Sequence, residues 1–256
     1  MPVFETPDGA TIAYDDLGPR DGRAAVLVHG ITSNRYEAWK RTGWYAAFER
    51  RGQRVVALDL RGHGESMKSH DPADYGRARL VGDVLALMDH LDLTAVDLVG
   101  YSMGARVALG VALAAPGRVA NLILGGVGGR ALESSRTGDV MAAAMEAEDP
   151  ETIAEPLLRS FRQFADEQGE DRLAIAAFTR APSEPLNPDD LFALTMPVLV
   201  VAGARDGLAG DPQGLADLIR GARAVTLAGC DHFNAIPHAL LKAAVFDFLD
   251  GYLDEF

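Results

Sequence analysis

The chain of 256 residues is long enough for one large domain, or for one domain that carries an insertion, and 48% of its residues are apolar. Its net charge of −13 disfavours nucleic acid and anionic lipid as partners, because like charges repel. Cys230 is the only cysteine, which excludes an intrachain disulfide. The sequence shows neither the basic start with a long apolar run that is typical of a leader nor an apolar run typical of a membrane span. We therefore expect a cytoplasmic protein.

Two short β-rich runs, at residues 3–6 and 11–14, flank the turn signal Pro7-Asp8-Gly9 and predict an antiparallel hairpin. Strands and helices then alternate along the chain. We predict strands at residues 24–28, 55–58, 96–100 and 119–124, and helices at 36–50, 75–91 and 103–114. This alternation predicts an α/β fold, a doubly wound and mostly parallel sheet that is covered by helices on both faces.

The alternation stops in the middle of the chain. Predicted helices at residues 131–147, 151–168 and 171–179 follow one another without a strand, and the pattern resumes with strands at 198–202 and 224–227 and a helix at 238–252. We therefore predict a core domain made of residues 1–127 and 195–256, and a helical cap made of residues 128–194. The cap is expected to cover a cleft at the carboxyl ends of the strands, where such sheets bind ligands.

Ser102 lies in a G-x-S-x-G motif, Gly100-Tyr101-Ser102-Met103-Gly104. The motif follows a predicted strand and opens a predicted helix, the context that a nucleophile elbow requires. Small residues on either side let the strand and the helix approach each other. The sequence therefore predicts Ser102 as a nucleophile, against the alternative of a serine that only caps the helix.

A serine nucleophile needs a histidine base and an acid that orients the base. His232 lies in the loop directly after the last predicted strand and is the favoured base, with His238 at a helix start as the alternative. Asp206 follows the preceding predicted strand and is the favoured acid. Asp231 is its rival, although neighbouring side chains normally point apart, and Asp211 is expected to cap a short helix.

Two backbone N–H groups should stabilise the oxyanion of the reaction. We predict that they belong to Met103, directly after the nucleophile, and to Ile31, in the loop after the first parallel strand. His29 is expected to bond nearby backbone, with a catalytic role as the alternative. The polar loop at residues 59–66 is expected to hold an internal ion pair, either Asp59–Arg61 or Arg61–Glu65.

Apolar residues of the predicted cap are candidates for the substrate pocket. Phe161, Met141 and Met145 are predicted to contact the substrate, although such side chains often only pack a cap onto its base. Cys230 is expected to be a buried apolar residue. The residues predict no metal site.

Taken together, the His29-Gly30 loop, residues 59–66, the motif around Ser102, the Gly203–Asp206 segment and His232 resemble the α/β-hydrolase superfamily. The similarity is greatest to the small bacterial esterase, enol-lactonase and non-haem haloperoxidase branch. It implies an eight-stranded sheet, a helical cap after the sixth strand and no cofactor.

The expected activity is hydrolysis of a small carboxylic ester or lactone through an acyl-enzyme. An acyltransferase, a thioesterase and a carbon–carbon bond hydrolase remain alternatives with the same three residues, and a weakly catalytic ligand-binding receptor is an alternative of another class. The expected partner is a small ester-type molecule, with no nucleic acid and no membrane. The sequence leaves the natural substrate and the oligomeric state open.

Overall fold

The computed structural model describes residues 2–132, 137–182 and 187–254. Within them, eight strands form one sheet in the order β1-β2-β4-β3-β5-β6-β7-β8. Only the hairpin strands β1 and β2 run antiparallel to their neighbours, and the other six strands are parallel. The strands are β1 (Val3–Glu5), β2 (Thr11–Leu17), β3 (Ala25–Val28), β4 (Val55–Leu58), β5 (Val96–Tyr101), β6 (Val119–Gly125), β7 (Val198–Gly203) and β8 (Arg223–Leu227). The predicted fold class is thus confirmed.

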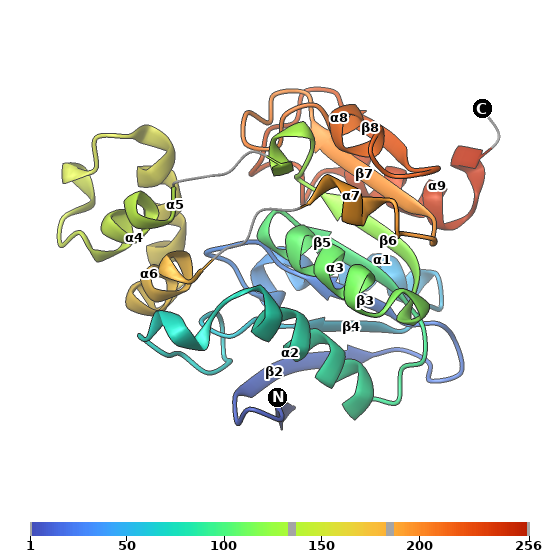
Figure 1. The fold of residues 1–256 in the computed structure, drawn as a ribbon, viewed down its shortest axis with the longest axis horizontal. Coiled ribbons are helices and arrows are strands. Elements are labelled where there is room, and N and C mark those ends of the chain that lie inside the picture. Colours follow the sequence, from blue (N-terminus) through green and yellow to red (C-terminus); the bar gives the residue numbers. More distant parts are fainter. Residues whose placement is uncertain (1, 133–136, 183–186, 255–256) are drawn as a thin grey trace.

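Helices cover both faces of the sheet (Figure 1). One face packs against α2 (Arg77–His90), α3 (Met103–Ala114), α7 (Pro188–Leu191) and α8 (Pro212–Ala216), and the other face packs against α1 (Trp44–Arg50) and α9 (Ala239–Leu249). Because both faces are covered, strands such as β3 and β4 are buried throughout, which explains their unbroken apolar sequences.

Three further helices form a group beside the sheet, on the left in Figure 1. They are α4 (Thr137–Glu146), α5 (Pro156–Glu167) and α6 (Arg172–Arg180). Met145, Phe161 and Ile175 belong to the small apolar core between them. Ile31, from the loop after β3, packs against this core, so the three helices lie next to the carboxyl end of β3.

Three predicted helices differ from the structure. In the prediction at residues 151–168, a 3₁₀ turn (Pro150–Thr152) comes first and α5 begins only at Pro156. The prediction at residues 36–50 is interrupted: a π-helical turn (Tyr36–Lys40) precedes α1, because Gly43 between them adopts a left-handed conformation with φ of 84°. In the prediction at 131–147, residues 133–136 lie outside the described part, and α4 begins at Thr137. No helix in the described residues has the length and apolarity needed to cross a bilayer.

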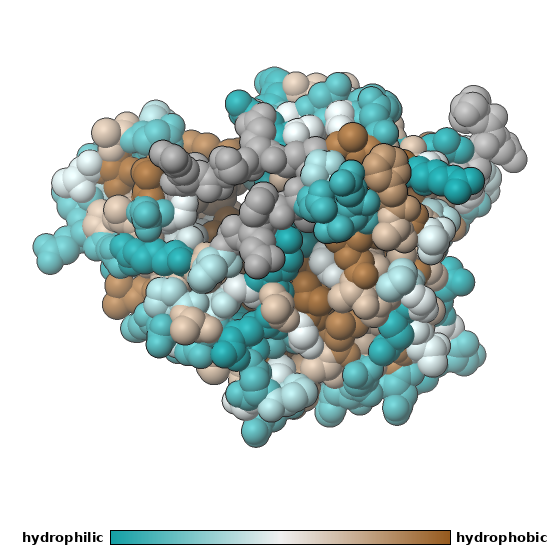
Figure 2. Space-filling model, in the orientation of Figure 1, coloured by the Kyte–Doolittle hydropathy of each residue, from teal (hydrophilic) through white to brown (hydrophobic). Residues whose placement is uncertain are grey.

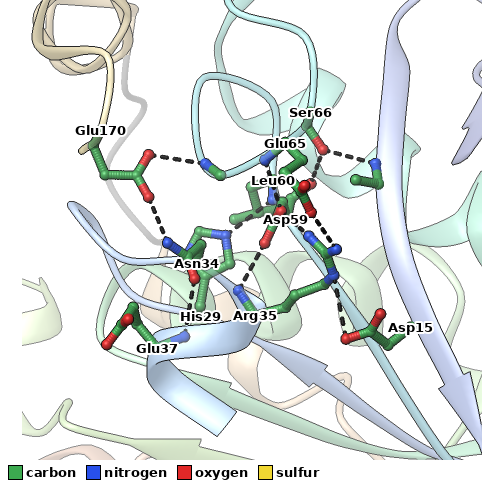
Figure 3. A network of polar contacts seen from close by, with 12 residues as sticks. Asp15, His29, Asn34, Arg35, Glu37, Asp59, Leu60, Glu65, Ser66 and Glu170 are labelled. Atoms are coloured by element: carbon green, nitrogen blue, oxygen red, sulfur yellow. Dashed lines mark hydrogen bonds and ion pairs between the residues drawn. The ribbon is translucent and has the colours of Figure 1, made fainter. Parts of the chain in front are cut away.

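The ion pairs predicted inside the loop at residues 59–66 are wrong. Asp59 and Glu65 both pair with Arg35, in the segment after β3 (Figure 3). Arg61 pairs with Asp83 of α2. The loop is packed among other elements, so its charged side chains bind partners that are distant in the sequence.

Candidate active site

Ser102 lies on a sharp turn between β5 and α3. Its backbone has φ of 55° and ψ of −114°, a conformation that L-residues rarely adopt. The turn brings strand and helix so close that a Cβ atom on Gly100 would lie 2.3 Å from the Gly104 carbonyl oxygen. A Cβ on Gly104 would lie 2.2 Å from the carbonyl oxygen of Val28. The glycines of the motif are therefore required by backbone packing.

Ser102, His232 and Asp206 form a continuous chain of hydrogen bonds. The Oγ of Ser102 lies 2.9 Å from Nε2 of His232, and Nδ1 of His232 lies 2.8 Å from Oδ2 of Asp206. Asp206 and His232 are buried, with 5% and 8% of their surfaces exposed. The structure thus brings together the three residues that the sequence singled out, although 130 positions separate the serine from the histidine.

The loops that carry Asp206 and His232 are fixed by further contacts. The second oxygen of Asp206 accepts hydrogen bonds from the backbone amides of Leu208 and Ala209 at 3.0 and 2.9 Å. The hydroxyl of Tyr101, next to the serine, donates to the His232 carbonyl at 2.7 Å. These hydrogen bonds hold the Asp206 carboxylate and the backbone of His232 in place.

The rival residues have other contacts. Asp231 accepts hydrogen bonds from the amides of Phe233 and Asn234 in its own turn. His238 caps α9, and Asp211 caps α8, as predicted. The ring of His29 is bonded to backbone groups, again as predicted.

Cys230 is fully buried, as predicted. No group of three or more described His, Cys, Asp or Glu side chains is arranged to hold a metal ion.

Two cavities meet at Ser102. The first has a volume of about 180 Å³ and is lined by His232 and by the aromatic rings of Phe161, Phe164 and Phe233. The ring of Phe233 packs against the His232 ring, with centroids 5.8 Å apart. This cavity is therefore an apolar space that opens directly beside the imidazole.

The second cavity, of about 340 Å³, lies on the α3 side of Ser102. It is lined by Met103, Arg106 and Arg77 and by Phe178 of α6. Ser102, Ile31 and Phe161 line both cavities. Ser102 thus lies at the junction of the two cavities.

The predicted pocket residues are distributed unevenly. Phe161 lines both cavities and Met141 lines the second, whereas Met145 is fully buried between the helices and lines neither.

Ile31 lies beside the serine, and its amide donates no hydrogen bond to a described backbone group. Met103 is the first residue of α3, where an amide has no partner within the helix.

Sequence reasoning missed Phe233 and Arg106. Phe233 directly follows His232, and Arg106 lies four positions after Ser102, one helical turn along α3. Both spacings can be read from the sequence. Only the position of the cavities in the structure shows that these two residues line the space next to Ser102.

Comparison with known proteins assigns the family. The family described as alpha/beta hydrolase fold matches residues 25–177, more than half of the chain. The chain belongs to this family. A putative carbamate hydrolase RutD from Variovorax paradoxus is 32% identical to this chain over 254 residues, which cover 91% of this chain and 92% of the relative.

Other similar proteins carry different activities. The acetyltransferase component of the acetoin cleaving system from Pseudomonas putida is 35% identical over 214 residues, 78% of this chain and 56% of that protein. The chain spans about half the length of this and other curated relatives.

Among solved structures, a thermophilic esterase from Thermogutta terrifontis superposes with a TM-score of 0.77 at 26% identity, covering 98% of both chains. Matches to an enol-lactonase structure and to non-haem chloroperoxidases confirm the predicted resemblance.

Proposed function

We propose that this hydrolase cleaves a small carboxylic ester or lactone through an acyl-enzyme on Ser102. The observation that carries the proposal is the 2.9 Å contact between Ser102 Oγ and His232 Nε2, continued at 2.8 Å to Asp206. A hydroxyl within hydrogen-bond reach of an imidazole, which a buried carboxylate orients, is an activated nucleophile.

The reaction follows from these positions. Ser102 Oγ attacks the carbonyl carbon while His232 Nε2 accepts the hydroxyl proton. The amides of Met103 and Ile31 donate hydrogen bonds to the oxyanion. The alcohol then departs with the proton from His232, and a water molecule, deprotonated by His232, hydrolyses the acyl-enzyme. Asp206 holds the proton of His232 on Nδ1 and stabilises the imidazolium.

We further propose that residues 128–194 act as a cap over the core formed by 1–127 and 195–256. Phe161 and Met141, from the cap, contact the substrate, since both line a cavity that reaches Ser102. Phe164 and Phe233 add apolar walls beside the base. Such walls exclude water from the reacting atoms, which strengthens the electrostatic interactions of the site.

A fluorophosphonate probe followed by peptide mass spectrometry tests this function. We expect the adduct on Ser102, together with turnover of short-chain 4-nitrophenyl esters. In Ser102→Ala both signals should disappear, while the melting temperature stays within a few degrees of the parent. Full esterase activity in Ser102→Ala would refute the assignment, and absence of labelling in folded protein would favour a binding role.

Acyl transfer is the second candidate, because the relative from Pseudomonas putida is an acetyltransferase component. Both activities share the acyl-enzyme and differ only in the acceptor. Product analysis with competing thiols and alcohols separates them. Hydrolysis predicts free acid as the main product at millimolar acceptor, and transfer predicts a new ester or thioester.

A further inference from the structure

The second cavity places a cation one helical turn from the serine. Arg106 lies four residues after Ser102, and its amide bonds the Ser102 carbonyl at 3.3 Å. Residues at this spacing lie on one face of a helix, with Cβ atoms about 5–6 Å apart. Ser102 and the Arg106 side chain line the same cavity.

Arg106 lacks a neutralising carboxylate. Its guanidinium donates one hydrogen bond from Nη1, at 2.9 Å to the Ala131 carbonyl, and forms no ion pair with any described residue. Surrounding protein and the positive charge of Arg77 lower the pKa of Arg106. The described lining of this cavity contains no Asp or Glu. This part of the wall is therefore positive, although the whole chain carries a charge of −13.

The first cavity has no such excess charge. Its arginine, Arg41, forms an ion pair with Glu37, four residues earlier, and both residues line the cavity. The two sides of Ser102 thus differ in the charge that they offer to a ligand.

The position of the base decides which side takes which part of an ester. The leaving alcohol must receive a proton from His232, and His232 lines only the first cavity. The alcohol therefore occupies the first cavity, and the acyl chain extends into the second cavity towards Arg106. This assignment rests on the proposed function.

We propose that the acyl part of the substrate carries a carboxylate and that Arg106 binds it. The substrates are then monoesters of short dicarboxylic acids, with the second carboxylate a few carbons from the scissile carbonyl. Nε and Nη2 of Arg106 face a carboxylate side by side while Nη1 remains bonded to Ala131. A planar guanidinium suits this two-point geometry, and charge-assisted hydrogen bonds are the strong ones.

The test compares two esters that differ only at the chain end. The 4-nitrophenyl monoester of glutaric acid ends in a carboxylate, and 4-nitrophenyl pentanoate ends in a methyl group. We expect a higher kcat/KM for the glutarate ester, mainly through a lower KM. In Arg106→Gln the ratio of the two kcat/KM values should fall tenfold to a hundredfold, the loss expected for charge-assisted hydrogen bonds. Arg106→Lys should retain part of the ratio.

Arg41→Gln is the matched control, since it removes the same charge from the other cavity. It should keep the ratio within threefold. A wild type that hydrolyses both esters with no preference, or a ratio that Arg106→Gln leaves unchanged, would overturn this inference and leave the esterase proposal intact. Failure to hydrolyse either ester, together with no fluorophosphonate adduct, would overturn both.

Inhibition of the unmodified protein provides a readout that does not depend on the folding of a variant. Glutarate should compete with the neutral ester, and pentanamide should not compete at the same concentration. Absence of competition by glutarate would overturn the proposal.

Discussion

Glu170, in the turn between α5 and α6, accepts a hydrogen bond from the Asn34 side chain at 2.8 Å (Figure 3). Its other oxygen accepts from the amide of Gly64 at 2.8 Å. Asn34 follows Ile31 by three positions, and Gly64 belongs to the loop after β4. One carboxylate therefore ties the helical group to two loops of the sheet, one of which carries a predicted oxyanion donor.

The tie through Glu170 should depend on pH. Burial raises the pKa of Glu170 above its usual 4.5. The folded state then holds the proton more tightly than the unfolded chain, so stability from this group is greatest at low pH and is lost as pH rises above 4.5. Glu170→Gln does not titrate. The difference in unfolding free energy, wild type minus variant, should decrease between pH 4 and pH 7 in urea titrations.

Glu167→Gln is the control for this measurement, because Glu167 is exposed on the same α5 helix. Its difference from wild type at each pH is the baseline against which the Glu170→Gln difference is compared. A Glu170 difference that grows with pH would contradict the prediction.

The acid of the site can be identified by two matched substitutions. Asp206→Asn should lower kcat about 10⁴-fold, because an amide in this position favours the wrong tautomer of His232. Asp231→Asn should change kcat only a few-fold, since the Asp231 carboxylate bonds its own turn. Steady-state kinetics on one ester decide between them, and the reverse order of effects would assign the role to Asp231.

Two buried histidines should weaken the fold in mild acid. Burial lowers the pKa of His29 and of His63 from 6.5 to about 4, and the rings lie 5.2 Å apart. Nε2 of His29 accepts from the Leu60 amide at 3.0 Å, which requires a neutral ring with its proton on Nδ1. The unfolded chain binds protons first, so stability is lost as pH falls from 6.5 towards 4, by about 3 kcal/mol per ring.

Urea unfolding at pH 6.5, 5.5 and 4.5 measures this loss, and His63→Gln should reduce its slope. An equal slope in wild type and His63→Gln would show that His63 does not contribute.

The elbow glycine should tolerate no side chain. A Cβ on Gly104 meets the carbonyl oxygens of Val28 and His29 at 2.2 and 2.5 Å, and backbone cannot yield like a flexible side chain. Gly104→Ala should cost about 3 kcal/mol or more of stability. Gly82→Ala in α2, with open space around it, should instead stabilise by about 0.5–1 kcal/mol. Thermal unfolding of both variants tests the contrast, and a stable Gly104→Ala would disprove the packing argument.

Local patterns in the sequence predicted the sheet and its covering helices. Alternation of apolar strands with helical periodicity depends on the chemistry of neighbouring residues, so it can be read without the fold. The same holds for Ser102, His232 and Asp206, each of which lies in the segment that follows a strand. Parallel strands bring their carboxyl ends to one edge, and this rule predicted that the three side chains would meet.

Tertiary structure alone decided which side chains face the cavities and which charges pair. Met141 and Met145 lie one turn apart on α4, yet one lines a cavity and the other is enclosed by α5 and α6. Arg61 pairs with Asp83 and not within its own loop, and Arg106 lines the second cavity together with Ser102. The burial of a side chain and the choice of its ion-pair partner both depend on how separate helices, strands and loops pack against one another. A short stretch of sequence contains no information about that packing.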